Sequence, residues 1–85
     1  MVVDDSRPGA ALRERVAACR QMVDAARLNL DRARATRPDL DLRGFRADLL
    51  WALEEYESAI TEVGAPLPPR LRREIQLYRQ LADRR

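Results

Sequence analysis

Apolar residues recur every three or four positions through the first part of the chain, which is the period of one face of an α-helix. From position 12 to position 33 the spacing alternates regularly between four and three residues, as in a coiled-coil seam made of Leu12, Val16, Cys19, Val23, Ala26, Leu30 and Ala33. Ser6 is suited to cap the N-terminus, and Pro38 ends the segment. The pattern predicts a helix over 8–36, roughly 43 Å long at 1.5 Å per residue, so we expect an elongated shape.

A second helical pattern follows after a short acidic turn. Asp41 is the predicted N-cap, with Leu40 and Phe45 in the two positions of a hydrophobic staple. The predicted buried stripe comprises Leu42, Phe45, Leu49, Leu53, Tyr56, Ile60 and Val63. Gly64 is well suited to the position that follows a helix C-terminus. The sequence therefore predicts a second helix over 42–63.

A proline-rich connection leads into a third helical pattern. Pro68 or Pro69 fits the first turn of a helix, where the missing N–H costs nothing. The expected stripe is Leu71, Ile75, Tyr78 and Ala82, with Leu81 beside it. This pattern predicts a third helix over 68–82.

No segment alternates in the way that a β-strand does. The fold class predicted is all-α, an elongated antiparallel three-helix bundle in which a long helical hairpin carries a shorter third helix. We expect residues 1–85 to form a single helical domain, with residues 1–7 and 83–85 as flexible ends.

Composition limits the chemistry of this domain. The chain has 85 residues, one cysteine and no histidine, which excludes an internal disulfide and the usual zinc sites. Cys19 lies on the seam and is predicted to be a small core residue. No nucleophile with a neighbouring base is visible, so we expect no enzyme, no catalytic residue, no cofactor and no metal. The absence of a long apolar run or a leader-like start predicts a cytoplasmic protein that does not contact a membrane.

Charge is distributed unevenly along the chain. All 16 basic residues are arginine, which suits either a GC-rich coding bias or a selection of guanidinium groups for contacts. Residues 10–37 carry a net charge of +4, residues 38–63 carry −5 and residues 64–85 carry +4. An acidic middle helix between two basic helices favours the antiparallel arrangement, although exposed ion pairs add little stability.

Trp51 is the first candidate for a binding residue. On a helical wheel it lies about 200° from Leu49, near Ala47 and Ser58, and points away from the predicted stripe. Two interpretations stay open. The third helix covers Trp51 together with Leu50, or Trp51 is exposed and anchors a partner, since tryptophan is enriched among binding hot spots.

The first helix has a second apolar face, on which Ala11, Ala18 and Ala25 recur at heptad spacing. Ala10, Ala17 and Leu28 lie beside them. These alanines either favour helix formation, or receive the third helix, or form a homodimer contact. The predicted partner-binding set is Trp51, Ala47, Ser58, Leu28, Ala18 and Ala25.

Arginines form a further candidate site. On the third helix, Arg72, Arg73, Arg79 and Arg84 fall on the outward arc, where guanidinium groups can meet phosphates. Arg13, Arg20 and Arg27 of the first helix are candidates for the same role. The chain has no recognition-helix motif and a net charge of only +2, so a solvated basic face explains the same residues.

The order of the elements, a long helix, a second helix and a third helix after a Gly and Pro linker, resembles the all-helical chorismate mutases. The run Ala11-Leu12-Arg13-Glu14-Arg15-Val16 is similar to the start of the first helix in that family. Of that family's active-site residues, only Arg13 has a counterpart, because the required lysine is missing from this chain. The resemblance therefore implies an architecture, since one fold serves many functions.

The function predicted from the sequence is a small non-enzymatic helical module for protein–protein interaction or self-association. Its partner is a protein or a second copy of the chain, which would make a homodimer. The alternative is a small regulator that associates with nucleic acid through the arginine-rich face, and a lesser alternative is an enzyme similar to the chorismate mutases.

Overall fold

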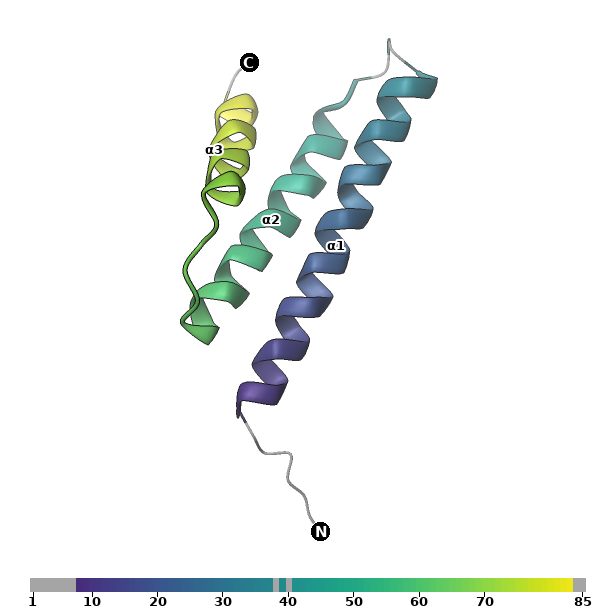
Figure 1. The fold of residues 1–85 in the computed structure, drawn as a ribbon. Helices are drawn as coiled ribbons and strands as arrows, with labels where there is room; N and C mark the ends of the chain where they lie inside the picture. The colour runs from purple at the N-terminus through teal and green to yellow at the C-terminus, as the bar shows by residue number, and fades with distance from the viewer. Residues whose placement is uncertain (1–7, 38, 40, 84–85) are drawn as a thin grey trace.

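The computed structural model describes residues 8–37, 39 and 41–83. They form three helices, α1 (Pro8–Thr36), α2 (Arg43–Val63) and α3 (Pro69–Asp83), and no strand occurs among them. α1 and α2 run antiparallel as a hairpin, and α3 lies beside α2 (Figure 1). The molecule measures 56 × 23 × 18 Å along its principal axes. The all-α fold class and the elongated three-helix arrangement are confirmed.

The three predicted stripes meet in one core. Its buried members are Val23, Leu30, Leu49, Ala52, Leu53, Ile60, Leu71, Ile75 and Tyr78. Ala52 of this core, and Ala59 one heptad later, are buried although neither belongs to the predicted stripe of the second helix. Their small side chains allow α1 and α2 to approach closely along this edge. The prediction was wrong at Ala82, which is exposed, whereas Leu81 packs against the core at the end of α3.

The ends of α2 differ in how their backbone groups are satisfied. At the C-terminus, Gly64 adopts a left-handed conformation with φ of 79°, and its N–H donates to the carbonyl of Thr61. The N–H of Ala65 donates to the carbonyl of Ile60 at 3.2 Å, which completes a Schellman motif. Because a positive φ favours a residue without a Cβ, the predicted role of Gly64 is confirmed.

At the N-terminus of α2 the predicted cap was wrong by one residue. The N-cap position is taken by Leu42, whose side chain makes no capping bond. Asp41 lies one residue earlier, but its Oδ1 still accepts the backbone N–H of Arg43 at 3.0 Å. A carboxylate thus meets an unpaired helix N–H without being the N-cap. Leu40 of the predicted staple and Ser6 of the first cap lie outside the described residues.

α3 is held to the hairpin by apolar contacts and by ion pairs. Leu71, Ile75 and Tyr78 bury their side chains in the common core, and α3 contacts α2 more closely than it contacts α1. Arg79 pairs with Glu54 of α2, joining Nε to Oε2 at 2.8 Å. The third helix includes Asp83, which the sequence placed in a flexible end. Within the described part of the chain, no helix is both long enough and apolar enough to cross a bilayer.

Candidate functional site

Trp51 is the largest exposed apolar side chain among the described residues, with 56% of its surface accessible. The interpretation that the third helix covers it is wrong. α3 packs elsewhere on α2, and the neighbouring Leu50 is the residue that packs against the core. Trp51 therefore remains open to solvent on the finished fold, and only the interpretation as an exposed residue is compatible with the structure.

A shallow groove of about 360 Å³ lies beside Trp51. We call it the Trp51 groove; its lining residues are Met22, Ala25, Ala26 and Asn29 of α1 and Asp48, Trp51 and Ala52 of α2. The Trp51 side chain, although it starts from the outer side of α2, thus borders residues of α1. Three alanines line the groove, and such small side chains leave room for a partner to approach the backbone.

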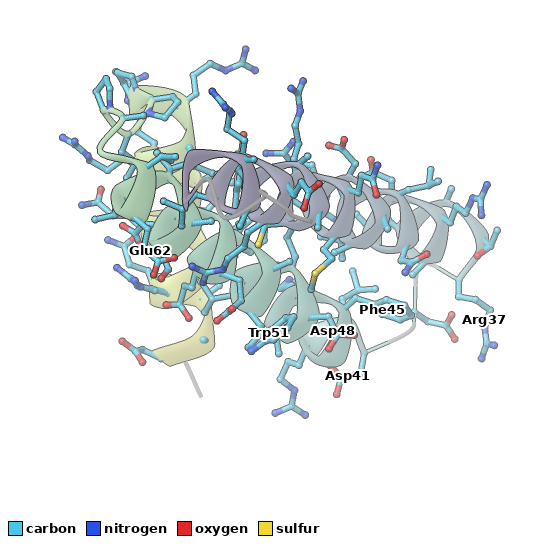
Figure 2. The ribbon with its side chains drawn as sticks, turned by 90° about the horizontal axis from the view of Figure 1, so that it is seen from below. Arg37, Asp41, Phe45, Asp48, Trp51 and Glu62 are labelled. Carbon is cyan, nitrogen blue, oxygen red and sulfur yellow. The ribbon has the colours of Figure 1, made fainter. Side chains whose placement is uncertain are left out.

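The charged groups around the Trp51 groove are mainly acidic. Asp48 precedes Trp51 by three residues, so the two are neighbours on the helix surface, as Figure 2 shows. Farther along α2, Glu55 and Glu62 share one guanidinium, that of Arg15, which lies 3.9 Å from Glu55. Among the residues described, Asp48 forms no ion pair. Arg32 follows the groove residue Asn29 by three positions on α1 and adds a second guanidinium. These three carboxylates still outnumber the guanidinium groups of Arg15 and Arg32.

A second and larger groove, of about 810 Å³, opens between α1 and α3. We call it the α1–α3 groove; its lining residues are Arg20, Val23, Asp24, Arg27, Tyr56, Pro68, Arg70, Leu71 and Glu74. It shares no residue with the Trp51 groove. On α1, the residues that line the two grooves lie on opposite sides of the buried seam, so the grooves occupy opposite flanks of the hairpin.

The guanidinium groups around the α1–α3 groove differ in whether they already form an ion pair. Arg27 bridges to Glu74 of α3, with Nε 3.0 Å from Oε2, and this hydrogen bond holds the pKa of the Arg27 guanidinium above its ordinary value. Arg20 and Arg70 form no ion pair within the described residues. Arg27 therefore fastens α3 to α1, whereas the charges of Arg20 and Arg70 are available to a ligand.

The structure brings together only part of the predicted partner-binding set. Trp51 and Ala25 line the same groove, and Ala18 lies exposed one heptad before Ala25. Ala47 and Ser58 are exposed on α2, and Leu28 is exposed on α1, but these three line neither groove. The interpretation that the third helix packs on the alanine face of α1 is wrong, because α3 makes its close backbone contacts with α2.

Sequence reasoning missed four residues that complete the Trp51 groove, one of which is the buried Ala52. Met22 and Asn29 are seven residues apart on α1, and Asp48 is three residues before Trp51 on α2. Both spacings place residues on one helix face. A search of the helical neighbours of Trp51 would have found Asp48, whereas Met22 and Asn29 required knowledge of how α1 sits against α2.

The arginines of α3 that were predicted to contact nucleic acid differ in whether they form ion pairs within the protein. Arg72 and Arg73 are exposed on α3. Arg79 pairs with Glu54 and Glu57, and the hydrogen bond to Glu54 raises the pKa of its guanidinium. Arg84 lies outside the described residues.

Cys19 is buried on the seam of α1, as predicted for a small core residue. In the described part of the chain, no cluster of three or more cysteine or carboxylate side chains is placed to hold a metal ion. Comparison with known proteins finds no similarity to this chain, neither among family models nor among curated proteins or solved structures.

Proposed function

We propose that the protein is a non-enzymatic helical module that binds a protein surface through the Trp51 groove. The observation that carries the proposal is the exposed tryptophan beside an apolar groove with a floor of small residues. A chain of 85 residues without histidine and with one buried cysteine has few groups for catalysis, which supports a binding role.

The energetics of such a contact favour Trp51 as its centre. A tryptophan buries roughly 150–250 Å² when it is fully covered. At about 25 cal/mol per Å² of apolar surface, covering the exposed half contributes about 2–3 kcal/mol to binding before entropy costs. Asp48 and Glu55 lie within one turn on either side, so the anchor is surrounded by groups that select a basic surface.

The test compares Trp51→Ala with a matched control, Leu77→Ala. Leu77 is also exposed, at 49%, but lies on α3 and lines neither groove. Tagged wild-type protein and both variants are cross-linked in a lysate of the producing cells, and their oligomeric states are measured by sedimentation. We expect a stoichiometric protein contact that survives nuclease treatment, persists in Leu77→Ala and is lost in Trp51→Ala. If the two variants retain the same contacts and the same oligomeric state, the proposal is wrong.

The alternative function, association with nucleic acid, is favoured by a row of arginines along one face of α1. Arg13, Arg20 and Arg27 lie at seven-residue intervals on α1, and Arg20 and Arg27 line the α1–α3 groove together with Arg70. This alternative requires binding to duplex DNA or RNA that weakens steeply with salt. A mobility-shift assay at about 50 mM salt, the low end of the range where phosphate contacts are strong, tests it. No shift with either duplex would contradict it.

A further inference from the structure

We propose that the α1–α3 groove is the binding site for the Trp51 surface of a second copy of this chain, so that the protein associates head to tail. The inference rests on the proposed function, because it uses Trp51 as the binding residue. It goes further by naming the partner and by assigning a role to the second groove.

Charge complementarity disfavours the simpler two-fold arrangement. A dimer in which two Trp51 grooves face each other would bring Asp48, Glu55 and Glu62 of each copy together, against two guanidinium groups on each side, those of Arg15 and Arg32. Facing like charges oppose association. The lining of the α1–α3 groove carries three arginines and two carboxylates, so its excess charge is positive. The Trp51 flank is therefore complementary to the α1–α3 groove and not to itself.

The α1–α3 groove also matches an indole ring in size and in chemistry. Its volume of about 810 Å³ accommodates a large aromatic side chain. The exposed Pro68 and the half-buried Tyr56 line its apolar part, together with the core residues Val23 and Leu71.

The rim of the groove supplies the matching charges. The guanidinium groups of Arg20 and Arg70, which have no ion-pair partner in the described residues, can stack on the indole face. Asp48 beside Trp51 then meets one of these arginines, so one contact uses both unpaired charges and the exposed ring.

The geometry of the two sites determines the form of the assembly. The Trp51 groove and the α1–α3 groove lie on opposite flanks of the hairpin, so a pair of copies keeps one free Trp51 surface and one free α1–α3 groove. Such a heterologous contact repeats and builds rings or chains instead of stopping at a dimer. We expect species larger than a dimer at high protein concentration, and we expect them to dissociate as the salt concentration rises.

The test uses one variant for each side of the contact. Trp51→Ala removes the inserted indole ring and leaves the α1–α3 groove intact. The double variant Arg20→Glu with Arg70→Glu reverses two charges of the α1–α3 groove and leaves Trp51 intact. Arg72→Glu with Arg73→Glu makes the same charge change on exposed arginines outside the groove and is the matched control. Circular dichroism verifies that every variant keeps its helices. Sedimentation is measured up to about 1 mM protein, where even weak association is visible.

The proposal predicts a result for each protein alone and for a mixture of the two variants. The wild type and the control variant associate, and each of the other two variants alone binds at least about tenfold more weakly, equivalent to 1.4 kcal/mol. An equimolar mixture of those two variants forms a heterodimer and nothing larger, because it retains one intact Trp51 surface and one intact groove. Trp51 is the only tryptophan of the chain, so its emission in the mixture reports directly on insertion of the ring.

Three results would overturn the inference, and they separate it from the proposed function. A wild type that stays monomeric at every concentration overturns self-association, while binding of Trp51 to another protein stays open to its own test. Association that is lost in Trp51→Ala but unchanged in the groove variant overturns the groove assignment alone. A mixture that forms no heterodimer overturns the head-to-tail arrangement.

Discussion

The two flanks of the α1–α2 hairpin are built from the same two helices, but only one of them is covered by α3. On one flank α3 adds Leu71, Ile75 and Tyr78 to the common core. On the other flank no described element covers Trp51 and Met22, which stay exposed. The difference shows that the role of an apolar residue here depends on where the third helix packs. The apolar residues that α3 covers stabilise the fold, whereas those on the open flank are available for binding.

The strongest way to break this comparison is to truncate one residue of each kind. Leu53 is fully buried and Trp51 is exposed. We expect Leu53→Ala to lower the free energy of unfolding by about 2–5 kcal/mol, because it removes packed groups and leaves a cavity. Trp51→Ala should change it by less than about 0.5 kcal/mol, as for other surface substitutions. Urea unfolding of both variants measures this, and equal losses would mean that Trp51 is part of the core.

A weaker effect is expected when the contact between α3 and the hairpin is truncated. Ile75 is buried at this contact, with 2% of its surface exposed. Ile75→Ala should lower the free energy of unfolding by about 2 kcal/mol, at the low end of the range for such truncations, because α3 packs mainly on one helix. Amide hydrogen exchange should then rise in α3 before it rises in α1 and α2. Exchange that rises equally in all three helices would contradict the picture of α3 as an added element.

Two glycines, Gly44 inside α2 and Gly64 directly after its end, sharpen the comparison at the level of the backbone. Gly64→Ala places a Cβ at a φ of 79° and should cost about 1 kcal/mol. Gly44 is the control, since it has an ordinary φ and nothing within 4 Å of an added Cβ. Gly44→Ala should stabilise the protein by about 0.4–1 kcal/mol, because it reduces the entropy of the unfolded chain. Thermal unfolding distinguishes the two signs, and the same sign for both would contradict the assigned role of Gly64.

The smallest effect concerns Asp41 and depends on pH. The hydrogen bond from the Arg43 side chain, together with that from the Arg43 backbone N–H, lowers the pKa of Asp41 from 3.8 to about 2. A lowered pKa in the folded state means that the contribution to stability is present above pH 3.8 and is lost as the pH falls toward about 2. The melting temperature of the wild type should exceed that of Asp41→Asn at neutral pH. The difference should vanish near the lower end of that window, and a difference independent of pH would argue against this pair.

Most of the fold could be predicted from the sequence because helix periodicity, proline and glycine act locally. The seam that includes Val23 and Leu30 is buried as expected, and the Schellman motif forms at Gly64. The candidate site was only partly predictable. Trp51 was found by its position on the helical wheel, but whether the third helix covers it depends on contacts between residues far apart in the chain. The α1–α3 groove escaped prediction for the same reason, since Arg20 and Arg70 are 50 positions apart.

The sequence by itself determined the three helices, their approximate ends and most of the residues that each helix buries, because these depend on spacing within one helix. It also determined the alternation of basic, acidic and basic helices, which the ion pairs of Glu62 with α1 and of Glu54 with α3 follow. Only the tertiary structure decided that α3 packs mainly on α2, which leaves Trp51 exposed and opens a groove toward α1. Packing between helices depends on how whole surfaces fit, and no local pattern specifies that fit.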